Sequence, residues 1–157
     1  MKISFWSIGK EHDAYLKEGV VEFTKRILRY FPIEWQIIPV PKNAGVLLEK
    51  DLKKKESQIL LQLIKEDDFL VALDEGGKQF SSEELAFFLQ RRATESTKHI
   101  VFLIGGAFGL DASVLHRANL KWSLSQLTFP HQLVRLILAE QVYRACTILR
   151  NEKYHHR

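Results

Sequence analysis

Three segments of the 157-residue sequence place glycines or small polar side chains directly after apolar runs. They are residues 73–78, 104–109 and 124–130. Glycine lets a ligand approach the main chain closely, and exposed backbone amides and carbonyls can bind an adenine or a ribose. Each segment alone could be an ordinary turn between a strand and a helix. The three together favour a nucleotide-like pocket.

Other common chemistries lack their sequence signatures. No Gly-Lys-Ser/Thr follows the glycines of residues 104–109, so a phosphate-binding P-loop is poorly supported. The dinucleotide fingerprint needs its glycines after the first strand, whereas here they come in the fourth strand–helix unit. The histidines near the C-terminus, His131, His155 and His156, lack carboxylates at ligand spacing. We therefore expect no metal site.

Alternating strands and helices must position these segments. The hydrophobic pattern predicts strands at residues 2–8, 33–40, 69–73, 99–104 and 120–124, and helices at 13–29, 46–65, 81–97, a short one after Asp111, and 131–150. The later strands are apolar on both faces, as buried parallel strands are. The fold class is therefore α/β, a mostly parallel sheet sandwiched by helices in three layers. Ligands bind at the carboxyl ends of such strands, where the three segments would meet.

Length and composition predict one domain spanning residues 1–157. The chain is 46% hydrophobic, which excludes intrinsic disorder. The single cysteine, Cys146, excludes a disulfide framework and a thiolate zinc cluster, and its apolar surroundings predict a core position. No apolar run approaches the roughly 20 residues that span a bilayer, and the N-terminus does not resemble a signal peptide. We therefore expect no membrane association and a cytoplasmic location.

Positive charge is concentrated near the C-terminus. Seven of the 23 basic residues but only two of the 19 acidic residues follow His116. A localised basic region often binds an anionic partner, nucleic acid first, although it could also be a solvated helix face. We expect the region from Arg117 onward to contact phosphates. Residues 53–55, three lysines, are interpreted as a solvated side of a helix.

The last predicted helix is apolar on most of its sides. One stripe is continuous, comprising Val134, Leu138, Val142, Ala145 and Leu149, while further apolar residues, Leu133, Leu136, Ile137, Tyr143 and Ile148, lie elsewhere around the helix. A helix of this kind must be covered on most sides. The pattern favours a second subunit as part of the cover, with a neighbouring helix of the same chain as the alternative.

Long motifs in the second half resemble one known family. They are residues 102–110 (Phe-Leu-Ile-Gly-Gly-Ala-Phe-Gly-Leu), 122–135 (Trp-Ser-Leu-Ser-Gln-Leu-Thr-Phe-Pro-His-Gln-Leu-Val-Arg), 140–145 (Glu-Gln-Val-Tyr-Arg-Ala) and the tail 151–157. The chain is similar over its full length to the ribosomal large-subunit methyltransferase H family, a minimal branch of the SPOUT methyltransferases. The resemblance implies a C-terminal trefoil knot, which runs against ordinary connection rules.

The resemblance also implies the reaction and its partners. The family transfers a methyl group from S-adenosylmethionine, without a metal, to N3 of a pseudouridine in a stem-loop of 23S rRNA on assembled ribosomes. It works as a homodimer and does not act on DNA. The family's donor contacts fall on the three segments described above, at Leu73, Gly105, Gly106, Ser125, Gln126, Leu127, Thr128, Phe129 and Pro130. Many relatives have methionine where Leu127 stands, an exchange of similar volume.

Loss of the N3 proton needs a nearby base or a cation that favours the anion. The catalytic candidates form the tail, Tyr154, His155, His156 and Arg157, and the candidates for substrate binding are His131, Arg135 and Arg144. Relatives usually end in Tyr-His followed directly by a basic residue, whereas His156 intervenes here. The choice between His156 and Arg157 for stabilising the anion stays open, with His155 expected to aid proton loss. In the dimer, the tail of one subunit would complete the pocket of the other.

Three alternatives remain at this stage. The tail could be only a basic RNA-gripping end, without a part in the chemistry. The protein could be a non-catalytic RNA-binding protein, which would have no affinity for S-adenosylmethionine. It could also be a knotted methyltransferase acting on tRNA or on a ribose 2′-hydroxyl.

Overall fold

A five-stranded, entirely parallel sheet forms the centre of the molecule. The computed structural model describes residues 1–156. The strands are β1 (Lys2–Ile8), β2 (Ile33–Ile38), β3 (Phe69–Gln79), β4 (His99–Ile104) and β5 (Leu120–Ser123), in the spatial order β2-β1-β4-β3-β5. The predicted α/β class with a parallel sheet is confirmed. The strand order by itself does not test the predicted knot.

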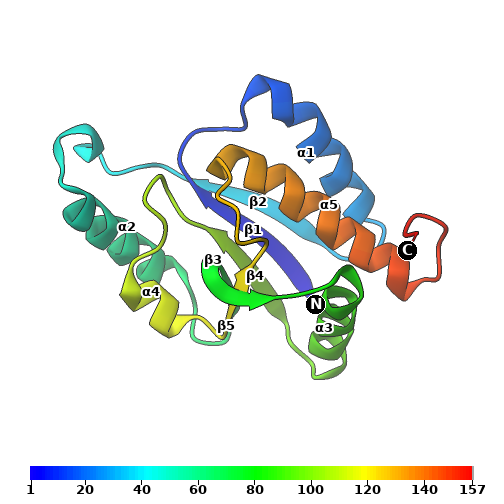
Figure 1. Cartoon of the computed structure of the whole chain (residues 1–157). Coiled ribbons are helices and arrows are strands. Elements are labelled where there is room, and N and C mark those ends of the chain that lie inside the picture. The colour runs from blue at the N-terminus through cyan, green and yellow to red at the C-terminus, as the bar shows by residue number, and fades with distance from the viewer. Residues whose placement is uncertain (157) are drawn as a thin grey trace.

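Helices cover both faces of the sheet, as Figure 1 shows. The helices are α1 (Ala14–Ile27), α2 (Glu49–Leu63), α3 (Ser82–Thr94), α4 (Ala112–Arg117) and α5 (His131–Leu149), with a short 3₁₀ turn at Ala44–Val46. Two apolar cores separate the layers. The first lies between the sheet and α1, α3 and α5 and contains Phe5 and Phe102. The second lies beneath α2 and α4 and contains Leu70 and Leu103. Both faces of the central strands are therefore buried, as their continuous apolar character predicts.

Side-chain hydrogen bonds fix the N-terminal ends of two helices, α3 and α4. The Ser81 side chain accepts a hydrogen bond from the Glu84 N–H at 3.1 Å, and the Glu84 carboxylate accepts one from the Ser81 N–H at 2.7 Å. This reciprocal pair is the capping box that starts α3. The Asp111 carboxylate accepts from the Ser113 N–H at 3.0 Å and starts α4 as predicted.

Several predicted elements have different bounds in the structure, and two of the differences concern the cavity side of the fold. The prediction ended a strand at residue 73 and placed a loop at residues 73–78, whereas β3 continues to Gln79. The pairing with β5 shifts between Leu73 and Lys78, so the extra residues form an irregularity within the strand. The Cβ of any larger residue at Gly77 would lie 2.6 Å from the Lys121 main chain, which explains a glycine at this crossing. The second predicted helix begins at Glu49 rather than residue 46.

Helix α5 lies between α1 and α3 on one face of the sheet (Figure 1). Its predicted apolar stripe faces the first core. Two of its other apolar residues face α1: Leu136 packs against Gly19, and the Tyr143 ring lies 5.8 Å from that of Phe23. Neighbouring helices of the same chain thus cover much of the surface that was attributed to a second subunit. Leu133 and Ile137 are half-buried and belong to neither core, whereas Ile148 packs against the first core.

The described cations that follow His116 do not gather on one exposed face of the structure. Arg117 donates hydrogen bonds to the main-chain oxygens of Lys65 and Asp68, at 2.8 and 3.1 Å, and so joins the end of α4 to the turn before β3. This is the amino edge of the sheet, opposite the carboxyl ends of the strands. Arg135 is fully buried, and Arg144 pairs with Glu140. Sequence position alone could not show that these cations serve the fold. Lys121, Arg150 and Lys153 stay exposed.

Candidate active site

A cavity of about 610 Å³ lies at the carboxyl ends of β3, β4 and β5. Three stretches line it: the turn after β4, the loop before α5, and β3 around Leu73. Of the nine residues predicted to hold the methyl donor, eight line this cavity, namely Leu73, Gly105, Gly106, Ser125, Leu127, Thr128, Phe129 and Pro130. Gln126 is exposed and is not part of the lining. The volume suits a ligand of cofactor size.

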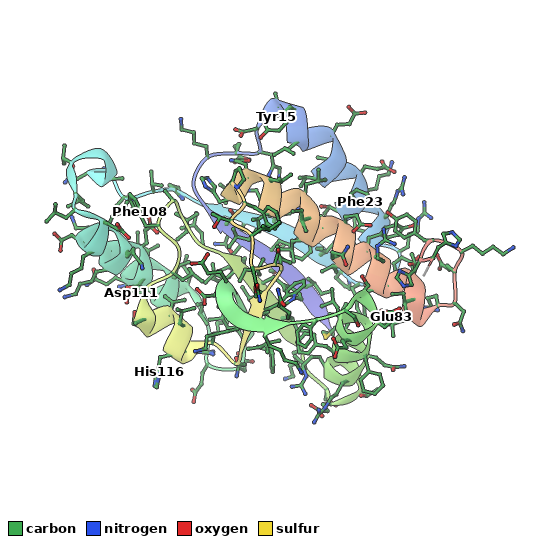
Figure 2. All side chains as sticks on the ribbon, in the orientation of Figure 1. Tyr15, Phe23, Glu83, Phe108, Asp111 and His116 are labelled. Carbon is green, nitrogen blue, oxygen red and sulfur yellow. The ribbon has the colours of Figure 1, made fainter. Side chains whose placement is uncertain are left out.

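The turn after β4 folds tightly on itself. The Gly109 N–H donates to the Gly106 carbonyl oxygen at 3.1 Å, and Gly109 has φ +80°, a conformation that favours glycine. A Cβ at Gly105 would lie 2.9 Å from the carbonyl carbon of Gly109. Glycine is therefore required for the turn to close. Phe108 projects from this turn beside α2 (Figure 2) and is 49% exposed.

The loop before α5 is held by serine side chains. The Ser123 hydroxyl donates to the Ser125 carbonyl oxygen at 3.0 Å, and the Ser125 hydroxyl accepts from the Leu127 N–H at 3.0 Å. These bonds fix the main chain where it faces the cavity. Both walls of the cavity are thus built from backbone in defined turns. Such walls can bind a nucleoside through amides and carbonyls, as the sequence predicted.

The predicted substrate-binding residues lie in different environments. His131 lines the cavity at the start of α5 and is half-buried, and burial together with the Arg135 charge lowers its pKa. Arg135 has no exposed surface; its Nε donates to the Ser7 hydroxyl at 2.9 Å, and its Nη1 lies 3.2 Å from His12 Nδ1. In this arrangement Arg135 can influence a substrate only through its neighbours. Arg144 lies near the other end of α5.

The C-terminal tail folds back onto the second half of α5, away from the cavity. The Tyr154 hydroxyl donates to Glu140 Oε1 at 3.0 Å, and the Arg144 guanidinium lies 4.8 Å from the centroid of the Tyr154 ring. His155 Nε2 lies 3.0 Å from Glu83 Oε1, and Figure 2 shows Glu83 on α3 beside the tail. His156 is exposed, and Arg157 lies outside the described residues. Burial and the Glu140 carboxylate raise the pKa of Tyr154.

Within one protomer, the donor cavity and the C-terminal tail, which are the two predicted parts of the active site, therefore lie apart. The cavity lies at the first turn of α5, whereas Tyr154 contacts Glu140 and Arg144, further along the helix. At 1.5 Å per residue, these two positions are roughly 14–20 Å along the helix from its first residue. None of the described tail residues lines the cavity of the same protomer.

Several charged residues at or near the cavity were not predicted as part of the site, among them Asp74 and Glu75, which line it. Lys53 of α2 lines the cavity, although residues 53–55 were interpreted as a solvated helix side. Glu56, one turn further along α2, is 5% exposed and lies against Gly106. A signal for Glu56 existed in the sequence, because it falls between Leu52 and Leu60 at the four-residue spacing of the apolar stripe.

Cys146 occupies the core, as predicted, with 1% exposure. Burial raises the pKa of its thiol to about 12. Since the thiolate is the reactive form, we expect iodoacetamide at neutral pH to leave the folded protein unmodified and to label it rapidly in urea. Mass spectrometry of both samples checks this. Equal labelling rates in the two conditions would contradict the packing of α5.

The described part of the chain offers neither a metal site nor a membrane-spanning helix. Within residues 1–156, no group of three or more His, Cys, Asp or Glu side chains is arranged to hold a metal ion. Nor does any helix there combine the length and apolar character needed to cross a bilayer.

A parallel α/β sheet with a backbone-lined cavity beyond β3, β4 and β5 is the arrangement of a nucleoside-binding enzyme. Residues 1–155 match the family model described as "Predicted SPOUT methyltransferase". The chain is 46% identical over 156 residues to the ribosomal RNA large subunit methyltransferase H of Cytophaga hutchinsonii, covering 99% of this chain and 100% of that one. The enzymes of the same name from Parabacteroides distasonis and Christiangramia forsetii are 42% identical over 156 residues and 43% identical over 157, covering 99% and 100% of each chain. The chain belongs to the ribosomal RNA large subunit methyltransferase H family of SPOUT methyltransferases.

Membership makes the protein a methyltransferase, and the family implies S-adenosylmethionine as donor. The predicted family and enzyme class are confirmed. The individual donor-binding, substrate-binding and catalytic residues stay predictions, now with positions in the fold.

Proposed function

We propose that this protein transfers the methyl group of S-adenosylmethionine to N3 of a pseudouridine in a stem-loop of 23S rRNA, on the assembled ribosome. The relatives named as ribosomal RNA large subunit methyltransferases support the RNA class. The observation that carries the proposal is the cavity at the strand ends, because eight of nine predicted donor-binding residues line it. A cytoplasmic location and a single domain over residues 1–157 belong to the same proposal.

The donor is held mainly by main chain. The turn at residues 105–109 and the loop at 124–130 would bind its adenosine portion, with Leu73 supplying an apolar contact. S-Adenosylmethionine supplies an electrophilic methyl group on a sulfonium. The protein's contribution is to hold this methyl in line with the acceptor nitrogen, and positioning of this kind accounts for much of the rate of a displacement.

The acceptor must lose its N3 proton as the bond forms. The tail groups Tyr154, His155, His156 and Arg157 are the proposed catalytic residues, with a cation stabilising the imide anion and His155 aiding proton removal. The hydrogen bond from Tyr154 to Glu140 and the contact of His155 with Glu83 hold the described part of the tail in one place. Such pre-organisation favours a defined catalytic role over a loose RNA-gripping end.

We place the complete active site in a homodimer, where the tail of one subunit lies at the cavity of the other. In one protomer the cavity lies at the first turn of α5 and the tail contacts its second half; a two-fold partner running antiparallel can bring its tail to the cavity. The half-buried outer residues of α5, among them Leu133 and Ile137, are available for such a contact.

Mass mapping of 23S rRNA from cells with and without the gene tests the substrate. We expect one methylated pseudouridine to disappear and to return when purified protein and S-adenosylmethionine are added to ribosomes from the deficient cells. Loss of a methyl group from tRNA, from a ribose hydroxyl, or from no RNA at all would contradict the proposal.

A further inference from the structure

A buried carboxylate lies directly behind the glycine turn of the cavity. Glu56 is on the apolar side of α2 between Leu52 and Leu60 and is 5% exposed. A Cβ built on Gly106 would lie 2.9 Å from both carboxylate oxygens of Glu56. The absence of a side chain at Gly106 is what allows the carboxylate to sit against this cavity-lining residue.

Glu56 has no counter-charge bonded to it. Among the described residues, 1–156, its carboxylate takes part in no hydrogen bond and no ion pair, although its oxygens keep slight contact with solvent, and Lys53, one turn earlier, acts on it only at longer range. Burial raises the pKa of Glu56, and Lys53 opposes that rise. Buried charges are normally paired, because an ion loses hydration when it leaves water. A largely buried carboxylate without a bonded partner, in contact with a cavity-lining glycine, is suited to attract a cationic ligand.

We propose that Glu56, from behind the glycine turn, adds to the negative charge that makes the cavity prefer the cationic methyl donor over its neutral product. This inference rests on the proposed function, since it requires that S-adenosylmethionine binds in this cavity. In the reaction, the bond between the acceptor nitrogen and the methyl carbon forms as the carbon–sulfur bond breaks. The electron pair of that bond stays on sulfur, and the acceptor proton leaves to the base.

The sulfonium is thereby converted to a neutral thioether. Glu56 attracts the donor before transfer and loses that attraction afterwards, so it favours exchange of S-adenosylhomocysteine for new donor. Coulomb attraction across several ångströms at the effective dielectric of a protein is large enough to change a binding ratio by about tenfold. Lys53 lines the same cavity with the opposite charge and has the opposite effect, while Asp74 and Glu75, which also line the cavity, contribute negative charge of their own.

Calorimetric titration of the full-length protein with S-adenosylmethionine and with S-adenosylhomocysteine tests the proposal. In Glu56→Gln, we expect the ratio of donor affinity to product affinity to fall about tenfold, because only the donor carries the sulfonium charge. Lys53→Met should raise the same ratio. Glu49→Gln removes an exposed carboxylate from the same helix and should leave the ratio unchanged.

The melting temperature is a second measurement, and it separates the proposed role of Glu56 from a purely structural one. The melting temperature of ligand-free Glu56→Gln should equal or exceed that of the wild type, because a buried unpaired charge has been removed. A ratio that is unchanged in both the Glu56 and Lys53 variants, or that moves in the same direction in both, would overturn the inference. Failure of the wild-type protein to bind either ligand would instead contradict the proposed function. If Glu56→Gln does not fold, the inference is tested by the ratio of donor affinity to product affinity in Lys53→Met alone.

Discussion

Removing residues 154–157 is expected to abolish methyl transfer to ribosomal RNA while leaving S-adenosylmethionine affinity within about twofold of the wild-type value. The tail contains the proposed proton-handling groups, and loss of general acid–base catalysis commonly costs 10²–10⁴-fold in rate. The cavity lies at the first turn of α5, and none of the described tail residues, 154–156, lines it. Single-turnover methylation of ribosomes, together with calorimetry of donor binding, separates the two effects.

A matched control for this deletion is Lys153→Gln. Lys153 is exposed and directly precedes the tail, so its substitution should preserve turnover at saturating ribosome concentration. Full turnover by the truncated protein would remove the tail from the mechanism. Loss of donor affinity by the truncated protein would show that the tail supports the fold of the cavity instead.

Gly106→Val is expected to lower S-adenosylmethionine affinity by at least tenfold. The first atom of the new side chain would lie 2.9 Å from both oxygens of Glu56, so either the carboxylate or the glycine turn must move. The sequence suggested a different reason, namely that the side chain would enter space needed for close approach of the ligand. The structure adds the clash with Glu56 behind the turn.

Gly45→Val provides the control, because a Cβ at Gly45 meets no atom within 4 Å. Both variants should show the circular dichroism spectrum of the wild type, and only Gly106→Val should lose donor binding in calorimetry. Undiminished affinity in a folded Gly106→Val protein would exclude the glycine turn from the donor site.

The sequence predicted most of the fold because its signals are local. Continuous apolar strands such as His99–Ile104, the capping box at Ser81 and the cap at Asp111 depend on residues within a few positions of each other. The rule that ligands bind beyond the carboxyl ends of parallel strands then brought three distant segments to one edge. That step depended on topology rather than on resemblance, and the cavity bears it out.

What the sequence could not predict depends on long-range contacts. The continuation of β3 to Gln79 depends on pairing with β5, which lies more than 40 residues away. The cations Arg117 and Arg135 look like candidates for RNA contact, yet one binds carbonyl oxygens before β3 and the other is buried beside Ser7. Whether a charged residue faces solvent, core or ligand is decided by packing that a charge count does not record.

Mixing two inactive proteins tests the central claim most directly. One subunit carries Gly106→Val and keeps its tail, and the other lacks residues 154–157 and keeps its cavity. If the tail of one subunit completes the cavity of its partner, random reassociation should restore about a quarter of wild-type methyl transfer, because half the dimers then hold one complete site. No recovery above the separate variants, in dimers shown by native mass spectrometry to have exchanged subunits, would contradict the composite site.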